Sequence, residues 1–312
     1  MDLVTSNQLI VVTDEDIEKT RLDNGIRNNM SEILDAIDHW CRKQEHLAEA
    51  YKYLERDVLE RLLLLSGGST EGAKKRIDKY LTSRGMMPEI LLNRSIEEFS
   101  GLLNCIHFVP LPKLCPTDRT RVLMTQFLKE NLSDFTILSY FRYAFMVGEY
   151  RLHIDYSLGE RYVVDLANVN ISLISKLNPI VLKKAEILCV ESFGTKIKGI
   201  HILNAPPFVD KLVFILKQAL REKVASRVHV HSSYEDLYKH IPKEILPRDY
   251  GGDEASCNKL AMQWRDLWKS QKVREMISKM DHLVSDETKR DTTKFNEEYL
   301  GIPGSFRKLS VD

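Results

Sequence analysis

The residues of this chain that could bind an anion are concentrated between positions 183 and 227. This stretch contains nine basic and four acidic residues, a net charge of +5, whereas the whole chain of 312 residues has 45 basic and 45 acidic residues and no net charge. A chain with balanced charges presents no broad cationic field to nucleic acid or to an anionic membrane. We therefore expect a local basic cleft and no nucleic-acid partner.

Four of these cations could share one anion. Lys196 and Lys198 stand two residues apart at the start of a predicted strand, so their ammonium groups face the same side. If the next predicted helix continues past Leu220, Lys223 and Arg227 lie on its apolar side. Cations on an apolar side need a partner, and the pattern by itself favours neighbouring carboxylates or solvent over a phosphate group.

Motifs for catalysis or metal binding give weaker signals. His229 and His231 face one side of a predicted strand, but no third metal ligand stands at a suitable spacing. Residues 67–74 resemble a phosphate loop, yet the closing Gly-Lys-Ser/Thr and a preceding strand are missing. The five cysteines form no CxxC pair, and no nucleophile elbow or acid-base pair stands out. We expect no enzyme activity, no metal, no cofactor, and the reduced thiols of a cytoplasmic protein.

Two kinds of periodicity show which elements position these residues. From Thr13 to about residue 92, apolar residues recur at helical spacing, as at positions 30, 33, 34 and 37, which predicts three or four helices. Past residue 105, short β-like runs at 107–109, 121–124, 162–166, 200–203 and 228–231 alternate with helices. Such alternation predicts an α/β domain whose mostly parallel sheet has a crevice at one end.

Three domains are predicted from these patterns. They are an all-helical N-terminal domain at 13–104, an α/β domain at 105–252, and a C-terminal helix and tail at 253–312. One long helix is predicted for about 258–280, followed from residue 287 by a loosely held polar tail. No signal peptide is visible, and the apolar runs are far shorter than the roughly 20 residues that span a bilayer.

A helix predicted at 207–220 has features of a membrane-binding surface. Phe214 lies among Lys211, Lys217 and Arg221 on the side opposite the apolar one. An aromatic ring can enter the acyl boundary while lysines meet headgroups. A single exposed phenylalanine is also common on ordinary proteins, so this signal is weak by itself.

Several runs of the sequence, read together, resemble one protein family. They are YVVDL at 162–166, NP at 178–179 with the lysine pair that follows, SFGTKIKGIHILNAP at 192–206, RVHVH at 227–231 and ILPRDYGG at 245–252. In this order they resemble the CRAL-TRIO lipid-transfer family, in particular the branch of the α-tocopherol transfer protein and cellular retinaldehyde-binding protein. The resemblance covers about residues 105–252, and the helical N-terminus fits more loosely.

The resemblance implies a fold and a function. The fold is an all-α bundle packed on an α/β/α domain, in which a gating helix closes a deep apolar cavity. The function is that of a monomeric cytoplasmic carrier, which encloses one hydrophobic ligand and transfers it during transient contact with membranes. The implied gate residues are Val209, Leu212, Val213, Phe214, Leu216 and Leu220, and the implied phosphoinositide ligands are Lys196, Lys198, Lys223 and Arg227.

Two departures from the family pattern affect these expectations. An arginine-containing segment that adds to the cleft in other members reads LLLLS here, at 62–66, so phosphoinositide affinity is expected to be weakened or lost. Ala144 and Gly148 occupy positions where tocopherol-type members carry hydroxyl groups, which favours a bulky isoprenoid such as a carotenoid or retinoid, with tocopherol still allowed. The predicted cavity wall is Phe141, Ala144, Phe145, Gly148, Val164, Leu166, Leu177, Leu188 and Phe193.

A second function from a different class stays open. The same fold and cleft would serve an adaptor that senses phosphoinositide and transfers no lipid. A carrier should copurify with an apolar molecule, whereas an adaptor should bind anionic vesicles with an empty cavity.

Overall fold

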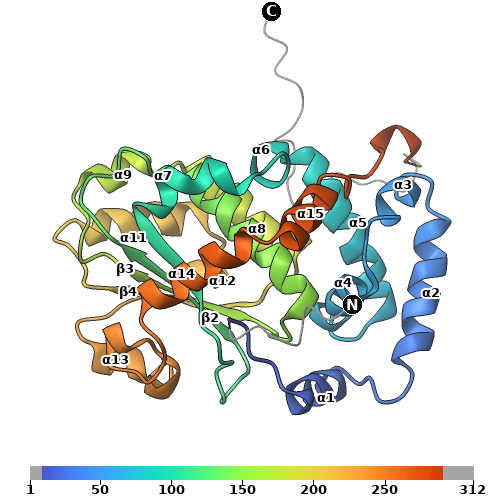
Figure 1. Ribbon diagram of the computed structural model, residues 1–312, viewed down its shortest axis with the longest axis horizontal. Helices are drawn as coiled ribbons and strands as arrows, with labels where there is room; N and C mark the ends of the chain where they lie inside the picture. The colour runs from blue at the N-terminus through green and yellow to red at the C-terminus, as the bar shows by residue number, and fades with distance from the viewer. Residues whose placement is uncertain (1–8, 291–312) are drawn as a thin grey trace, which may run out of the picture.

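A five-stranded sheet with the order β1-β2-β3-β4-β5 forms the centre of the α/β region in the computed structural model, which describes residues 9–290 (Figure 1). The strands are β1 (Ile106–Pro110), β2 (Arg121–Phe127), β3 (Glu160–Asp165), β4 (Ile197–Leu203) and β5 (Val228–Val230). β1 runs antiparallel to β2, and the remaining neighbours are parallel. Each predicted β-run coincides with one of these strands, and the predicted mostly parallel α/β fold is confirmed.

The segment before the sheet is helical. It contains α1 (Asp14–Asp23), α2 (Met30–Arg42), α3 (Ala48–Tyr51), α4 (Arg56–Leu65), α5 (Thr70–Met86), α6 (Pro88–Leu91) and α7 (Ser100–Leu103). The Thr13 side chain accepts a hydrogen bond from the Asp16 backbone at the start of α1, and Ser69 accepts one from Gly72 at the start of α5. Residues 67–74 are therefore a turn between α4 and α5 together with the first turn of α5.

Helices cover the sheet and connect its strands. They are α8 (Ile137–Ile154), α9 (Ser172–Lys176), α10 (Pro179–Ile187), α11 (Val209–Ala219), α12 (Glu222–Ala225) and α13 (Tyr234–Tyr238). Asn178 caps α10, because its side chain accepts hydrogen bonds from the Ile180 and Val181 backbones. A π-helical turn, Leu188–Ser192, continues α10 without a break.

The C-terminal region differs from the single long helix predicted. It consists of α14 (Cys257–Trp268) and α15 (Gln271–Met280), because the backbone at Ser270 is extended (ψ 127°) and interrupts the helix. α14 is held by aromatic packing, with Trp264 against Tyr150 of α8 and Trp268 against Tyr143. Of the predicted loose tail, residues 287–290 contact α5, and residues 291–312 lie outside the described part.

One buried charge cluster joins the N-terminal helices to α8. The Glu149 carboxylate accepts hydrogen bonds from both Arg84 and Arg94, and these charged groups are buried. Arg84 also donates to the Met280 carbonyl oxygen at 2.7 Å. Removing one member would leave an uncompensated buried charge, which is strongly destabilising. The division into three domains stays a prediction, although α1 to α7 precede residue 105 and α14 and α15 follow residue 252.

Candidate functional site

An apolar cavity of about 230 Å³ lies between one face of the sheet and helices α8, α10 and α11. The sheet face is selected by strand alternation: Tyr162 and Val164 of β3 and Ile200 and Ile202 of β4 face the cavity. α4 contributes Leu65, so the helical N-terminal region also reaches the wall. A mostly apolar enclosed space is suited to a hydrophobic ligand.

All of the predicted wall residues except Leu188 line this cavity. Those that do are Phe141, Ala144, Phe145, Gly148, Val164, Leu166, Leu177 and Phe193. Leu188 is fully buried elsewhere, because the cavity side of α10 and the π turn is occupied by Ala185, Cys189 and Phe193, which are spaced four residues apart. The prediction for Leu188 was therefore wrong by one residue, and Cys189 takes its place.

The small residues of α8 make room beside the sheet. Phe141, Ala144, Phe145 and Gly148 follow the helical repeat along one face of α8. A Cβ placed on Gly148 would meet no other atom within 4 Å, so this position opens onto free space. Ligand volume can therefore extend to the backbone of α8.

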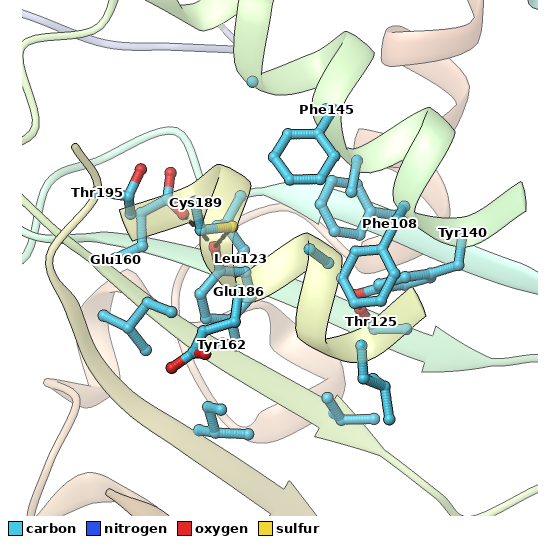
Figure 2. Close-up of a pocket in the computed structure, with 18 of the residues that line it drawn as sticks. Phe108, Leu123, Thr125, Tyr140, Phe145, Glu160, Tyr162, Glu186, Cys189 and Thr195 are labelled. Atoms are coloured by element: carbon cyan, nitrogen blue, oxygen red, sulfur yellow. Dashed lines mark hydrogen bonds between the residues drawn. The ribbon is translucent and has the colours of Figure 1, made fainter. Parts of the chain in front are cut away.

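Polar side chains that the sequence analysis did not predict line two parts of the wall. Figure 2 shows Thr125 and Tyr140 beside Phe108 on one side, and Glu160, Cys189 and Thr195 on the other. The Thr125 and Tyr140 hydroxyl oxygens lie 2.9 Å apart. The sequence signal for Thr125 is that it lies on the same face of β2 as the cavity-lining Leu123, and Tyr140 directly precedes the wall residue Phe141 on α8.

The second polar group is organised around a carboxylate. Glu160 accepts hydrogen bonds from the Tyr162 hydroxyl and from Arg151, whose Nη1 lies 2.7 Å from Glu160 Oε1. The Cys189 Sγ lies 3.9 Å from the Tyr162 oxygen. Burial raises the pKa of Cys189 to about 12 and the pKa of Tyr140 to about 12, so both stay protonated near neutrality. They can hydrogen-bond to a polar atom on an otherwise apolar ligand, and the thiol is not nucleophilic.

α11 covers the cavity with the residues predicted for the gate. Leu212, Leu216 and Leu220 line the cavity, whereas Val209 and Val213 are partly buried against the surrounding core. Phe214 points away from the cavity, and 64% of its surface is exposed. The predicted inward and outward sides of this helix therefore match the structure.

The helix does not continue past Leu220, contrary to one premise of the sequence analysis. α11 ends at Ala219, Leu220 is extended (ψ 151°), and the separate short helix α12 begins at Glu222. The break is stabilised by Glu186, whose side chain accepts a hydrogen bond from the Arg221 backbone at 2.8 Å. Lys223 and Arg227 thus follow α11 on a different element.

The four predicted anion ligands still lie around the start of β4. Lys196 and Lys198 flank Ile197, the first residue of β4, and α12 with Lys223 packs against the same strand. Arg227 donates a hydrogen bond to the Ile197 carbonyl oxygen. We call Lys196, Lys198, Lys223 and Arg227 the basic cluster.

Among residues 9–290, no neighbouring carboxylate pairs with the cations of the basic cluster, although the sequence pattern favoured such pairs. No carboxylate there lies within 4.0 Å of a side-chain nitrogen of the basic cluster. Glu191, the nearest candidate in the sequence, instead pairs with Lys79 and Arg221. The cluster is therefore available to an external anion.

The N-terminal leucine run contributes no cation to the basic cluster. Leu62, Leu63 and Leu64 are fully buried and Leu65 lines the cavity. The preceding Arg61 is buried with its guanidinium 4.1 Å from the centre of the Tyr156 ring, and burial lowers the pKa of Arg61 to about 10. The run therefore adds no exposed cation to the basic cluster.

The two histidines of the RVHVH run have more neighbours than the sequence indicated. His229 and His231 lie beside His201 of β4 and His240, which follows α13. Burial lowers the pKa of His201 to about 3, and the pKa values of His229 and His231 are also lowered by burial. His201 alternates with the cavity-facing Ile200 and Ile202, and His229 is its register partner on β5, so these imidazoles are on the sheet face opposite the cavity.

Comparison with known proteins shows what this chain is similar to. Residues 116–252 match the CRAL/TRIO domain. The protein named alpha-tocopherol transfer protein-like from Mus musculus is 26% identical over 227 residues, 69% of this chain and 66% of that protein. The Homo sapiens protein of that name is 31% identical over 110 residues, 33% of this chain and 32% of that protein.

Two further proteins that are similar to this chain have different names. Clavesin-2 from Homo sapiens is 32% identical over 91 residues, 29% of this chain and 28% of that protein. The chain therefore spans less than two thirds of the length of these relatives. The crystal structure of Sfh5 superposes with a TM-score of 0.43 at 11% identity, over 78% of this chain and 99% of that one. In residues 9–290, no helix is long and apolar enough to cross a bilayer.

Proposed function

From the match of residues 116–252 to the CRAL/TRIO domain, we propose that the chain is a carrier that encloses one hydrophobic, lipid-like molecule and transfers it between membranes. The proposal assigns no reaction to the chain and places its action in the cytoplasm, as a monomer in transient contact with membrane surfaces. The ligand proposed is an isoprenoid such as a carotenoid, a retinoid or tocopherol.

The observation that carries the proposal is the apolar cavity that α11 helps to line. Leu212 and Leu216 of α11, and Leu220 directly after it, form part of the wall, so displacement of this segment would widen the cavity. A structural core would fill such a space with side chains, because protein interiors are close-packed. An enclosed apolar space with a separate closing helix is what a carrier needs to shield its ligand from water.

The polar groups of the wall refine the proposed ligand. Tyr140 and Thr125 at one part of the wall, and Tyr162 with Glu160 at another, can each hydrogen-bond to a polar atom. An isoprenoid with a hydroxyl or carbonyl group can use one of them, whereas a pure hydrocarbon would leave them without a ligand partner. A ligand with a mostly apolar body and one polar end fits these groups best.

The basic cluster supports phosphoinositide-assisted release. Lys196, Lys198 and Lys223 are exposed, and Arg227 is half-buried beside them. Charge-assisted hydrogen bonds from these groups would hold the phosphates of a headgroup. A headgroup bound here would bring the neighbouring α11, with Phe214 exposed on it, close to the membrane surface.

The proposal is tested by identifying what the chain carries. Protein isolated from its natural source is analysed by native mass spectrometry and by solvent extraction, and the ligand found is then loaded for a vesicle-to-vesicle transfer assay. We expect an apolar molecule in near-stoichiometric amount and transfer that is faster than spontaneous exchange. An empty cavity in a protein that binds phosphoinositide vesicles would instead support the sensing adaptor.

A further inference from the structure

Four histidines form a cluster on the sheet face opposite the cavity, and the proposed function does not use them. His201 lies on β4, His229 is in β5 and His231 directly follows it, and His240 follows α13. The six distances between their ring centroids range from 4.8 to 6.2 Å. We call these residues the histidine quartet, in which three separate segments of the chain bring imidazoles to one place.

The ring positions match those required to share one metal ion. An imidazole nitrogen lies about 2.0–2.1 Å from a bound zinc ion, which places the ring centroids of two ligands at a tetrahedral angle about 5 Å apart. His201 lies 5.2 Å from His229, 5.1 Å from His231 and 5.1 Å from His240, measured between ring centroids. The central histidine therefore has each of the other three at the right distance.

The ring orientations differ from those of a metal-bound site. His201 Nδ1 and His231 Nε2 lie 2.9 Å apart and form a hydrogen bond, while His201 Nε2 is buried without a hydrogen-bond partner. In residues 9–290, the only side chains whose potential metal-ligand atoms already lie within 4.8 Å of one another are Glu55, Asp57 and His153, which are not part of the quartet. The quartet must therefore turn its rings to bind a metal, and the less buried His229 and His240 are the ones with space to do so.

A glycine and three charged residues surround the quartet. A Cβ on Gly199 would come within 2.4 Å of His201 Nε2, so glycine at this position leaves the space that the His201 ring needs. The charged groups that face the quartet are Arg161 of β3, and Asp236 and Lys239 from the region of α13. Arg161 is paired with Asp118 at 2.8 Å and Lys239 with Asp236 at 2.7 Å, so neither cation is left uncompensated.

We propose that His201, His229, His231 and His240 together bind one d-block dication of the zinc, copper or nickel type. An all-imidazole set suits these ions, whereas magnesium and calcium prefer oxygen ligands. Neutral imidazoles offer their lone pairs without first losing a proton. The site is independent of the lipid cavity, because the sheet separates the two.

A bound ion would fasten the edge of the sheet. β5 has three residues and forms the edge, where Val230 is 45% exposed, so few contacts hold this strand. The ion would tie β5 to β4 and to the segment ending at His240. Because Arg227 directly precedes β5, the same ion would also steady one side of the basic cluster.

The test uses the full-length chain after treatment with a chelator. It is titrated with ZnCl2 by calorimetry and with CoCl2 by visible absorption, and its Tm is measured with and without ZnCl2. We expect one ion per chain, a cobalt spectrum of tetrahedral nitrogen coordination, a rise in Tm with zinc, and no response to MgCl2.

Two variants and a matched control locate the site. Mutation of a residue that only hydrogen-bonds to a metal ligand typically lowers metal affinity by about ten- to a hundredfold. Removal of a ligand itself, by His229→Gln or His240→Asn, should therefore weaken zinc binding by at least that much. Both positions are partly exposed, so the metal-free proteins should keep the wild-type Tm. The control, Asp57→Asn, alters the other converging group and should leave zinc affinity unchanged.

Two results would overturn the assignment. The stripped wild-type protein could take up no zinc and show no change in Tm. Alternatively, the combined His229→Gln and His240→Asn variant could bind zinc with wild-type affinity, while Asp57→Asn lowers the affinity. That result would place the zinc site at Glu55, Asp57 and His153. Neither result bears on lipid transfer, which is measured separately.

Discussion

Arg221 Nη1 lies 2.6 Å from Glu191 Oε1, and this ion pair holds the segment that follows α11. The other carboxylate oxygen of Glu191 lies 2.9 Å from Lys79 Nζ on α5. Arg221 is also hydrogen-bonded through its backbone to the buried Glu186, which itself lines the cavity. The C-terminal end of the closing helix is thus anchored both to the π turn and to the N-terminal helices.

The first prediction concerns this anchor. Glu191→Gln removes the charge that pairs with Lys79 and Arg221, so α11 should open more often and release a loaded ligand several times faster. The groups are partly exposed, and each exposed pair is worth roughly 0.2–1 kcal/mol, so the free energy of unfolding should fall by only about 1 kcal/mol. Release is followed by ligand fluorescence after mixing with acceptor vesicles, and stability by urea unfolding.

The matched control for this prediction is Glu98→Gln. Glu98 pairs with Arg142 at 2.6 Å with similar exposure, but it contacts neither α11 nor the π turn. It should lower stability by a similar amount without changing the release rate. Equal acceleration by both variants would mean that general destabilisation, and not the anchor, controls release.

The second prediction concerns cavity volume. Gly148→Phe should place a ring in the open space beside α8, and Ala144→Phe should do the same one turn earlier. Ligand loading should fall by about tenfold or more, while the protein still folds, because overpacking typically costs about 1–3 kcal/mol. Loading is measured by extraction after expression with the ligand.

The control for the cavity is Met262→Phe on α14. Met262 is 56% exposed and does not line the cavity, so loading should stay at the wild-type level. Wild-type loading in both cavity variants would show that the ligand binds elsewhere.

Most residues of the cavity wall were predicted through the family resemblance. The resemblance indicates which helix and strands face the ligand, and periodicity then shows which of their residues share a face, such as Phe141 and Phe145 on α8. Leu188 could not be placed correctly, because Leu188 and Cys189 stand three and four residues after Ala185 and both fit a helical repeat. The choice between them depends on tertiary packing.

Features that depend on contacts between distant segments were not predictable. The break after Ala219 rests on the hydrogen bond from the Arg221 backbone to Glu186, which is 35 residues away in sequence. His240 joins His201 only because β4 and β5 pair and α13 turns back toward them. Local spacing contains neither relationship, so the sequence showed two histidines where the structure has four.

The third prediction concerns the basic cluster. Changing Lys196, Lys198 and Lys223 together to Ala should abolish the preference for vesicles containing phosphoinositide over neutral vesicles, because these exposed side chains have no other charged partner within residues 9–290. Arg227 is left intact because it also hydrogen-bonds to the Ile197 backbone. Binding is measured by vesicle flotation at several salt concentrations, and ligand loading should be unchanged.

The control for the basic cluster removes the same number of charges elsewhere. Lys259, Lys272 and Lys279 lie on α14 and α15, and their joint replacement by Ala should keep the headgroup preference. If unmodified protein binds neutral and phosphoinositide vesicles equally, the cluster has no such role.

The fourth prediction concerns acid stability near the C-terminal end of the described chain. Burial opposes ionisation of Asp78, but hydrogen bonds from His46 and Arg290 outweigh it and lower the pKa of Asp78 to about 2. An unfolded aspartate has a pKa of about 3.9, so ionised Asp78 stabilises the fold fully above that pH. This stability is lost as pH falls from about 4 toward about 2.

Arg290→Met tests the Asp78 pair. It should lower the free energy of unfolding by about 1–2 kcal/mol at pH 7, and the difference from wild type should shrink between about pH 4 and pH 2 as Asp78 becomes protonated. Urea unfolding across this range measures it. A difference that stays constant with pH would show that Arg290 acts through packing and not through the charge of Asp78.

The last prediction concerns exchange at the membrane. Opening α11 in water exposes Leu212 and Leu216, at roughly 1.5–3 kcal/mol for each large apolar side chain, whereas acyl chains can receive the same face at a membrane. Contact with a membrane should therefore trigger opening, with Phe214 as the first apolar contact. Phe214→Asp should slow transfer to vesicles by about tenfold but change equilibrium ligand affinity little, because this side chain points away from the cavity. An engineered disulfide joining α11 to α10, against which it packs, should keep a preloaded ligand bound and slow its transfer until a reductant is added. Release at the unlocked rate by the oxidised protein would show that α11 is not the gate.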